Sequence, residues 1–426
     1  MNKIVKRVLK PLQGCVEIPA DKSLSHRAIM FSSLAKGRSV IRNFSKGADC
    51  LSTMSVCRQL GVDCEIQEEN TLVINSKGSF LPPLTSLDCG NSGTTMRLMS
   101  GILAGQSFDS CLTGDDSLSK RPMQRVITPL SQMGAEILSS EGKAPLKILG
   151  RSLKSIDYQS SLSSAQVKSC VLLAGLFADG ETSYAEPAKS RDHTERMLKA
   201  MGANITVDGN VVKIRPSELS PIDITVPGDI SSAAFFIVAA SIIPESDIIL
   251  KNVGVNPTRT GIIDVVKRMG GDISLLNLRE ELGEPVADIR VRYSSLKATT
   301  ICGDEIPRLI DELPVITLLA SQANGQTVIK DAADLRNKEA DRISAVASAM
   351  AQFGANITET SDGFIIQGKI DLYGGCEVET FHDHRLAMTY YVAGLIAKNP
   401  IEINGFEWIN ISFPEFEYLM GVLQGD

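Results

Sequence analysis

One pattern of apolar and polar positions recurs six times along the 426 residues of this chain. Each copy opens with a polar cluster, continues in a run rich in Ala, Leu, Met and Ser, and later reaches a glycine at the end of a second, amphipathic run. A helix that ends with a glycine in the left-handed conformation explains this last feature. The six glycines are Gly61, Gly134, Gly202, Gly270, Gly354 and Gly421.

The copies predict one structural unit with the order helix, strand, helix, strand, strand. The first helix of each copy is apolar nearly all round, so we expect it to be buried. The second helix carries charges, as in residues 191–200, and we expect it to face solvent. Six units are too many for one core, because single cores stop growing near ~250–300 residues. Two domains of three units each are therefore expected, with a crossover near residues 227–229.

The charge balance and the apolar stretches exclude two classes of partner. The formal net charge is −7, and an acidic chain does not suit nucleic acid, which needs a broad basic face. The most apolar stretch, residues 233–243, is shorter than the ~20 residues of a membrane span, and the N-terminus lacks the apolar core of a signal peptide. The nine cysteines are scattered without a C-x-x-C pair, as in a reducing compartment. We therefore expect a cytoplasmic protein that binds neither nucleic acid nor membranes.

The polar openings of the buried helices are the first candidates for a functional site. A helix N-terminus has unpaired N–H groups and a partial positive charge, which suit an anion. Each Ser, Asn or Asp taken singly is explained as a helix cap, but the accumulation of Lys and Arg at buried helix starts is not. Brought to one surface, these openings would form a cationic cleft on an acidic protein. The residues at the openings are Lys22, Ser23, Ser25, Arg27, Asn91, Gly93, Arg97, Ser164, Gln166, Lys168, Asp383 and Arg385.

Two further features have more than one interpretation. Residues 334–342 are the densest charge cluster, which is either an exposed helix start with ion pairs or part of a charged site. Asp311 follows an apolar turn, and its carboxylate is either the N-cap of the fifth helix or a proton acceptor partly withdrawn from water.

No further ligands accompany His382 and His384, so no metal site is predicted. The sequence also contains no G-x-x-x-x-G-K-[ST] motif for a nucleotide phosphate.

Several short motifs resemble those of the enolpyruvylshikimate-phosphate synthase family, in the same order along nearly the whole chain. The resemblance implies a two-domain inside-out α/β barrel with three units in each domain. It places residues 1–19 and 230–426 in one domain and residues 20–229 in the other, with the active site in the cleft between them. The motifs run from Asp21 to Ala28, Gly90 to Thr94, Lys120 to Met123, Ser164 to Lys168, Ser190 to Glu195, Ile310 to Glu312, Arg336 to Arg342 and Asp383 to Arg385.

The resemblance also implies a reaction. The enolpyruvyl group of phosphoenolpyruvate would be transferred to the 5-hydroxyl of shikimate 3-phosphate, with release of phosphate, by a monomer without a metal or an organic cofactor. Addition to the double bond needs an acid and a base at once, hence two carboxylates in contrasting surroundings. Asp311 would accept the proton of the 5-hydroxyl. Glu339 would protonate the methylene carbon, with Lys22 and His384 as the other candidates for the proton donor.

The matched positions further imply binding roles. Lys22 would contact both substrates, Gln166 would lie between them, and Lys338 would contact the shikimate. Guanidinium groups suit the phosphate and the carboxylate of phosphoenolpyruvate because both accept bidentate hydrogen bonds. The positions implied for the shikimate phosphate and ring hydroxyls are Ser23, Arg27, Ser164 and Arg191, and those implied for phosphoenolpyruvate are Gly93, Arg121, Arg342 and Arg385.

Three positions depart from the family pattern. Ala165 stands where many members have a second Ser, and Asn337 stands where a small apolar residue is commoner. Ile411 replaces a Lys of many members, which leaves one phosphoenolpyruvate contact without its usual residue. Gly93 occupies the position where Ala is found in forms that tolerate the inhibitor glyphosate, so we expect susceptibility.

Two other functions remain open at this point. One is the sister enolpyruvyl transferase that acts on UDP-N-acetylglucosamine and usually has a Cys in a mobile loop as its acid. Here residues 120–122 are Lys-Arg-Pro in the corresponding region, and Cys111 falls in a predicted strand. The other is a phospho-ligand binding protein that has lost its chemistry, although Asp311 and Glu339 are both present.

Overall fold

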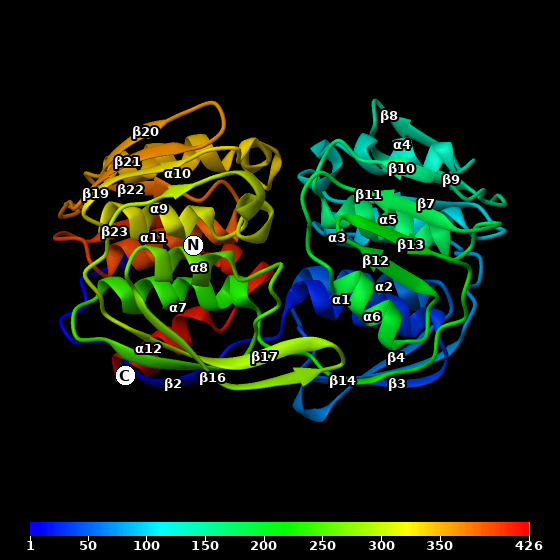
Figure 1. Ribbon diagram of the computed structural model, residues 1–426, viewed down its shortest axis with the longest axis horizontal. Helices are drawn as coiled ribbons and strands as arrows, with labels where there is room; N and C mark the ends of the chain where they lie inside the picture. The colour runs from blue at the N-terminus through cyan, green and yellow to red at the C-terminus, as the bar shows by residue number, and fades with distance from the viewer. Residues whose placement is uncertain (426) are drawn as a thin grey trace. The chain divides into compact units, whose positions relative to one another are not determined.

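The structure is a computed structural model that describes residues 1–425, with only the backbone of Glu69. The chain forms two compact units (Figure 1). The middle unit contains Ala20–Val226 and Glu280–Glu284. The terminal unit contains Met1–Pro19, Pro227–Arg279 and the chain from Pro285 on.

The middle unit has three four-stranded sheets, each with two helices. The first sheet has the order β14-β3-β5-β4, the second β6-β7-β9-β8 and the third β10-β11-β13-β12. The elements of the first are α1 (Lys22–Leu34), β3 (Lys36–Arg42), α2 (Ala48–Gln59), β4 (Asp63–Gln67), η1 (Glu68–Asn70), β5 (Thr71–Lys77) and β14 (Asp223–Thr225). Those of the second are β6 (Leu87–Asp88), α3 (Gly93–Ala104), β7 (Ser110–Thr113), η2 (Leu118–Lys120), α4 (Gln124–Gln132), β8 (Glu136–Ser140) and β9 (Lys143–Leu149). Those of the third are β10 (Asp157–Gln159), α5 (Ala165–Gly175), β11 (Thr182–Ala185), α6 (His193–Ala200), β12 (Ile205–Asp208) and β13 (Val211–Ile214).

The terminal unit has two four-stranded sheets and one three-stranded sheet. Their orders are β16-β17-β15-β2, β18-β19-β21-β20 and β1-β23-β22. The elements of the first are β2 (Gln13–Glu17), α7 (Ile230–Ile242), β15 (Asp247–Gly254), α8 (Gly261–Arg268), β16 (Asp272–Glu281) and β17 (Glu284–Arg292). Those of the second are β18 (Thr300–Ile301), η3 (Gly303–Arg308), α9 (Leu313–Ser321), β19 (Gly325–Ile329), η4 (Ala333–Asn337), α10 (Arg342–Gln352), β20 (Asn356–Glu359) and β21 (Phe364–Gly368). Those of the third are β1 (Asn2–Val5), β22 (Glu377–Glu379), α11 (His384–Gly394), β23 (Ile401–Asn404), η5 (Phe406–Ile411) and α12 (Phe416–Gln424).

The repeated unit differs from the prediction by one short strand before its first helix. This strand pairs in parallel with the strand that follows the helix, as β6 does with β7 and β18 with β19. These strands have only two or three residues in β6, β10, β14, β18 and β22, too few for an alternating pattern to be recognised in the sequence. The observed order is therefore strand, helix, strand, helix, strand, strand.

Two of these opening strands complete a sheet three repeats away. β2 precedes α1 in the chain but pairs in parallel with β15, in the sheet of the fourth repeat. β14 precedes α7 but pairs in parallel with β3, in the sheet of the first repeat. The sixth repeat has no two final strands within residues 1–425, and β1 from the chain's start pairs antiparallel with β23 instead.

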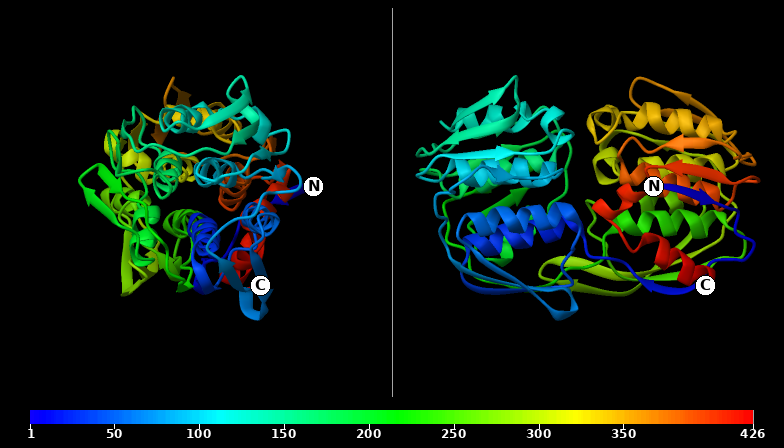
Figure 2. Two further views of the ribbon diagram at one scale, coloured as in Figure 1. Left: turned by 90° about the vertical axis from the view of Figure 1, so that its right-hand side faces the viewer. Right: turned by 180° about the vertical axis from the view of Figure 1, so that it is seen from behind.

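In each unit the helices lie inside and the sheets outside. Every residue of α7, α9 and α11 is buried, and α1, α3 and α5 are buried over most of their length. The strands alternate, with one face on the helices and the other in solvent, as in β9. Figures 1 and 2 show this arrangement: the sheet of β3, β4 and β5 lies along the outer edge of its unit, next to α1 and α2. The predicted inside-out α/β fold with buried first helices is confirmed.

The predicted glycine caps are confirmed in five repeats and wrong in the sixth. Gly61, Gly134, Gly202, Gly270 and Gly354 each follow a second helix with φ between +85° and +94°. Gly421 lies inside α12, which ends instead at Gly425 with φ +82°. The prediction that residues 191–200 face solvent is also wrong, because the first turns of α6 are buried and only its last two residues are exposed.

The boundaries of the units differ slightly from those implied by the resemblance. The middle unit ends at Val226 rather than at residue 229, and it includes residues 280–284 at the tip of the β16–β17 hairpin. The side chain of Arg196 in α6 donates to the carbonyl of Gly283, and the ring of His193 is 2.8 Å from Glu284, which explains why this tip groups with the middle unit. Among residues 1–425 no helix is long and apolar enough to cross a bilayer.

Candidate functional site

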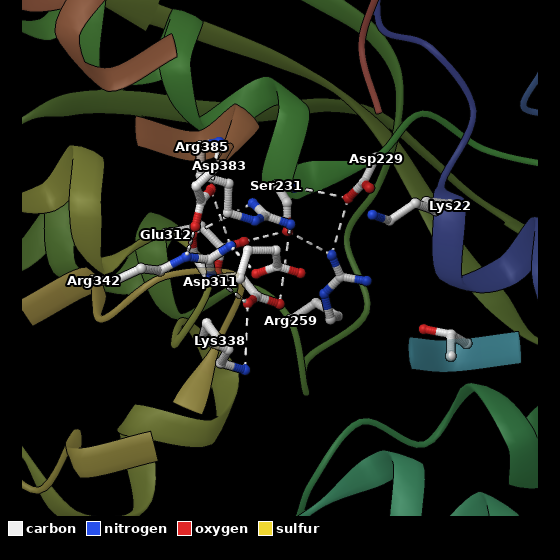
Figure 3. A network of polar contacts seen from close by, with 12 residues as sticks. Lys22, Asp229, Ser231, Arg259, Asp311, Glu312, Lys338, Arg342, Asp383 and Arg385 are labelled. Carbon is white, nitrogen blue, oxygen red and sulfur yellow. Dashed lines mark hydrogen bonds and ion pairs between the residues drawn. The ribbon is translucent and has the colours of Figure 1, made fainter. Parts of the chain in front are cut away.

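Arg342 is the centre of a buried cluster of charges in the terminal unit (Figure 3). It is the first residue of α10, and its side chain is only 1% exposed. Its Nε lies 2.7 Å from Oδ2 of Asp383, its Nη2 lies 2.6 Å from Oε2 of Glu339, and its Nη1 lies 3.3 Å from Oδ1 of Asp311. One guanidinium thus connects carboxylates from three different segments of the chain.

The pKa of Arg342 shows which effect is stronger in this cluster. Burial acts to lower the pKa of the guanidinium, because the charged form loses solvation. The charges of Asp383, Glu339 and Asp311 act in the opposite direction and raise the pKa above its ordinary value. Arg342 is therefore a fixed positive charge that holds these carboxylates in place.

Asp311 is not a helix cap. The N-cap position of α9 belongs to Glu312, whose side chain makes no capping hydrogen bond. The carboxylate of Asp311 is 15% exposed and lies among three cations: Arg342, Lys338 at 3.6 Å and Arg385 at 4.0 Å. Of the two interpretations of the sequence, the structure excludes the cap and leaves the carboxylate in a charged site.

The charged stretch of residues 334–342 combines both of its proposed roles. Arg336 forms exposed ion pairs with Asp341 and Glu359, as expected of a solvated helix start. Lys338 lies between Asp334 at 3.4 Å and Asp311, and so connects the exposed part to the buried cluster. The same nine residues therefore supply surface ion pairs and three members of the cluster, namely Lys338, Glu339 and Arg342.

Asp383 lies at the opening of α11, as the sequence predicted, although the resemblance assigns it no role. Its Oδ1 accepts a hydrogen bond from the backbone N–H of Arg385 and so caps α11, while both oxygens contact Arg342. Its side chain is fully buried. The neighbouring His382 does not pair with it, because the ring of His382 stacks on Trp408 with the centroids 4.4 Å apart.

In the middle unit, the start of α1 is capped and carries a lysine. The Oδ1 of Asp21 accepts from the N–H of Leu24 at 2.8 Å. Lys22 follows, and its Nζ lies 3.2 Å from Oδ2 of Asp49 on α2. Ser23 is half-buried in the same turn, and its carbonyl accepts from Nη1 of Arg27.

Arg27 connects three buried helices of the middle unit. Its Nε donates to Oγ1 of Thr194 on α6 at 2.8 Å, and its Nη2 donates to Oγ of Ser169 on α5 at 2.9 Å. These hydroxyls are also 2.7 Å from each other. The resemblance assigns this guanidinium to the shikimate phosphate. The two hydroxyls fix its direction, and because they are neutral they do not neutralise its charge.

The second opening brings two guanidinium groups close to Gly93, the first residue of α3. A Cβ on Gly93 would lie 2.8 Å from Nη1 of Arg97 and 3.5 Å from Nη1 of Arg121. The side chain of Ser92 caps the helix by accepting from the N–H of Thr95. Arg121 is held by Oδ1 of Asn91 at 2.8 Å. The lack of a side chain at Gly93 is what lets these groups approach the helix start.

The third opening is joined to the second through Gln166. Its Oε1 accepts from Nη1 of Arg97 at 2.6 Å, and its Nε2 donates to Oγ1 of Thr94 at 3.0 Å. Ser164 occupies the N-cap position of α5, but its side chain makes no capping hydrogen bond. The first N–H groups of α5 therefore lack a side-chain cap, which is the condition that favours an anion there.

Lys168 does not face this opening, contrary to the prediction. It is buried between Glu186 and Glu195, with both N–O distances 2.8 Å. Burial acts to lower its pKa, but the two carboxylates outweigh it and raise the pKa. The carboxylate of Glu186 also accepts from the N–H and the hydroxyl of Ser190, so this group fixes the loop that carries the half-buried Arg191.

Two of the three positions that depart from the family pattern are direct chain neighbours of site residues. Ala165 is the first residue of α5, and Asn337 ends η4 directly before Lys338. Ile411 ends η5 and is half-buried. Cys111 lies in β7, as the sequence predicted.

Within each unit, the structure brings together most of the residues predicted from the sequence. In the terminal unit, Asp311, Lys338, Glu339, Arg342 and Arg385 form one cluster. In the middle unit, Gly93, Arg121 and Gln166 lie around Arg97 or beside it, and Arg27 joins α1 to α5 and α6. The residues that sequence reasoning missed, Thr194 and Ser169, share one signal: each is a buried polar group that needs a partner.

Comparison with known proteins gives a consistent result. A family model described as EPSP synthase (3-phosphoshikimate 1-carboxyvinyltransferase) matches residues 6–420. The 3-phosphoshikimate 1-carboxyvinyltransferase of Citrifermentans bemidjiense is 52% identical over 430 residues, which cover 100% of both chains. That of Geobacillus kaustophilus is 54% identical over 411 residues, which cover 95% of this chain and 96% of the relative. A solved structure of EPSP synthase from Acinetobacter baumannii is similar with a TM-score of 0.89 and 44% identity, covering 99% of this chain and 98% of that chain.

Proposed function

The chain belongs to the EPSP synthase family, and on this premise we propose that the two charged clusters supply its substrate-binding and catalytic groups. It is a transferase that moves the enolpyruvyl group of phosphoenolpyruvate to the 5-hydroxyl of shikimate 3-phosphate and releases phosphate. This is a step of aromatic amino-acid biosynthesis. The sister reaction on a UDP-sugar is not favoured, because the relatives named above carry the shikimate activity over the full chain.

Asp311 is the proposed proton acceptor. The observation that carries this assignment is its position: the carboxylate caps no helix and lies among Arg342, Lys338 and Arg385. Three neighbouring cations favour the ionised form, which is the form that accepts a proton. Because the carboxylate keeps some exposure, a hydroxyl of the substrate can reach it.

Glu339 is the proposed proton donor. It contacts Arg342 at 2.6 Å and is more exposed than Asp311, so the two carboxylates have contrasting surroundings. An incoming anion that binds Arg342 would weaken the hold of that arginine on Glu339 and favour protonation of Glu339. The pair then has an acid and a base, as the addition requires.

The proposed reaction has two stages. In the addition, Glu339 gives a proton to the methylene carbon of phosphoenolpyruvate, and the 5-oxygen bonds to the adjacent carbon as its own proton passes to Asp311. In the elimination, the bond from that carbon to the phosphate oxygen breaks, the new methyl group returns a proton to the Glu339 carboxylate, and the departing phosphate takes up the proton held by Asp311. The double bond is thereby restored in the enol ether product, and no electron is gained or lost overall.

The middle-unit cluster is proposed to hold the anionic groups of both substrates. Arg27, Ser23, Ser164 and Arg191 would bind shikimate 3-phosphate, and the α5 N-terminus supports this because it lacks a side-chain cap. Gly93 and Arg121 would bind phosphoenolpyruvate, with Arg342 and Arg385 of the terminal unit. Lys22 would contact both substrates and Gln166 would lie between them, as its contacts with two helix openings suggest.

We further propose that both clusters act on the same pair of substrates. The proposed state is a monomer in the cytoplasm. The nine free cysteines in the structure are in line with this reducing compartment.

Phosphate release is the assay that tests the function. We expect release when the protein is mixed with phosphoenolpyruvate and shikimate 3-phosphate, and none with UDP-N-acetylglucosamine. In the same assay, Arg121→Ala and Arg385→Ala should each raise the KM for phosphoenolpyruvate about tenfold, corresponding to ~1.4 kcal/mol of lost binding. Release with the sugar alone would support the sister reaction, binding without release would support a non-catalytic protein, and an effect of only one arginine would contradict a shared site.

A further inference from the structure

We propose that Glu312, Ser231 and Arg259 form a positioning chain that holds the Asp311 carboxylate in its reactive direction. The inference rests on the proposed role of Asp311 as the proton acceptor. None of the three residues belongs to the two substrate-binding clusters. Figure 3 shows these three residues together with Asp311 and Arg342 in the terminal unit.

The direction of hydrogen bonding along this chain is fixed by chemistry. Nη2 of Arg259 donates to Oγ of Ser231 at 2.8 Å, and Arg259 has no acceptor with which it could receive a proton. Ser231 must therefore direct its own hydroxyl proton to Oε1 of Glu312, with which it forms a short hydrogen bond. Glu312 accepts this hydrogen bond, and its carboxylate cannot rotate without breaking the bond to Ser231.

The far end of the chain is anchored in the fold. Arg259 is 2% exposed, and its Nη2 lies 2.9 Å from Oδ1 of Asp229. The same oxygen of Asp229 caps α7 by accepting from the N–H of Ser231. The backbone N–H of Arg259 donates to the carbonyl of Asn256. The arginine thus cannot move independently of the start of α7 and the loop before α8.

The near end of the chain fixes the turn that carries Asp311. Glu312 is 1% exposed, its N–H donates to the carbonyl of Leu309, and its carbonyl accepts from the N–H of Ile316 in the first turn of α9. Adjacent residues of one turn are therefore held in two different ways. Glu312 is bound to α7 through Ser231, and Asp311 contacts the cations near α10 and α11. Release of Glu312 would free the turn to rotate and would move the Asp311 carboxylate.

Burial of these charges has a cost that stability alone does not explain. α7 and α9 are fully buried and mostly apolar, and a buried ionic group is often no more stabilising than an apolar residue of similar volume. What the chain adds is direction, because the hydrogen bonds of Ser231 with Arg259 and with Glu312 define one geometry. A displacement of about 1 Å at a reacting group can lower the rate about 100-fold. The rate gained by holding the Asp311 carboxylate in one direction can therefore offset the cost of burying these charges.

The test compares four single variants by steady-state kinetics. Glu312→Ala and Ser231→Ala should lower kcat about 10- to 100-fold while KM for both substrates changes less than about threefold, because the binding residues are untouched. Glu312→Gln should retain kcat within about threefold, because its amide oxygen still accepts from Ser231. Ser241→Ala is the matched control: Ser241 is buried in the same helix, its hydroxyl donates to the carbonyl of Ile237, and its kcat should be unchanged.

A double variant separates a connected chain from two independent effects. Ser231→Ala with Glu312→Ala should be no slower than the slower single variant, since either change alone interrupts the chain. Equal kcat values for Ser231→Ala and Ser241→Ala would overturn the proposal, and so would a Glu312→Gln variant as slow as Glu312→Ala. If Glu312→Ala does not fold, Ser231→Ala and Glu312→Gln decide the question by themselves.

Failure of this inference is distinguishable from failure of the proposed function. A wild-type protein that releases no phosphate from the two substrates, or one that keeps its full rate without the Asp311 carboxylate, contradicts the function. A wild-type protein that depends on Asp311 but tolerates both Ser231→Ala and Glu312→Ala contradicts only the positioning chain.

Discussion

Gly93 shows how a single missing side chain shapes the proposed anion site. Two guanidinium groups, of Arg97 and Arg121, lie over the first residue of α3 because no Cβ is present there. A methyl group would meet Nη1 of Arg97 at 2.8 Å, which is closer than a real Cβ contact allows. Arg97 also donates to Gln166, so its displacement would disturb a second predicted binding residue.

We predict that Gly93→Ala weakens phosphoenolpyruvate binding. The KM for phosphoenolpyruvate should rise about tenfold, in line with an overpacking cost of ~1–3 kcal/mol, and inhibition by glyphosate should weaken as well. Gly180→Ala is the control. Gly180 follows the C-terminal end of α5, whereas Ser164 lies at its N-terminal end, and a Cβ on Gly180 would meet only the flexible side chain of Ser155. Unchanged KM and unchanged inhibition in Gly93→Ala would show that Arg97 and Arg121 do not form the anion site.

At the same scale, the identity of the site residues was predictable but their partners were not. Asp311, Glu339 and Arg342 were recognised from short motifs, whereas the pairing of Arg342 with Asp383, 41 residues later, appears only in the fold. Lys168 was misplaced for the same reason. Its motif position is right, but its two carboxylate partners lie in segments that carry no signal for this pairing.

The buried first helices are the elements on which the site is built. Their starts were predicted from polar residues before an apolar run, and four of them are capped by an Asp or Ser side chain: Asp21, Ser92, Asp229 and Asp383. The short opening strands were not predicted, because two or three residues show no period. Their pairing is set by tertiary packing, which explains why β2 and β14 join sheets that are distant in sequence.

Helix α1 carries a histidine that should make stability depend on pH. His26 is fully buried, and burial followed by the charges of Lys22 and Arg27 lowers its pKa well below 6.5. The unfolded chain therefore binds a proton near pH 6.5 that the folded chain does not, so stability falls as the pH decreases below that value. This part of the free energy of unfolding is retained above pH 6.5.

We predict that His26→Gln removes this part of the pH dependence. Between pH 7.5 and 5.5, the wild-type free energy of unfolding should fall by about 1 kcal/mol more than that of the variant, as urea denaturation can measure at both values. The glutamine can still bond to Thr53, whose hydroxyl lies 2.7 Å from Nδ1 of His26. Parallel loss in both proteins would mean that His26 is not the responsible group.

At the scale of the whole molecule, repetition was the most predictable property. The number of repeats, the burial of their first helices and the inside-out α/β class follow from the sequence pattern and the family motifs. The ends of the chain are the exception. β1 takes the place of strands that the sixth repeat lacks within residues 1–425, and nothing in its four residues indicates that partner.

The account as a whole depends on Asp311 acting as the base. Asp311→Ala is therefore its most direct test, with binding of both substrates measured by calorimetry and turnover by phosphate release. Asp334→Ala is the control, because Asp334 contacts the same Lys338 from a more exposed position. We predict that Asp311→Ala keeps both dissociation constants within about threefold and lowers kcat about 10²- to 10⁴-fold, whereas Asp334→Ala keeps its rate. Wild-type turnover by Asp311→Ala would contradict the account.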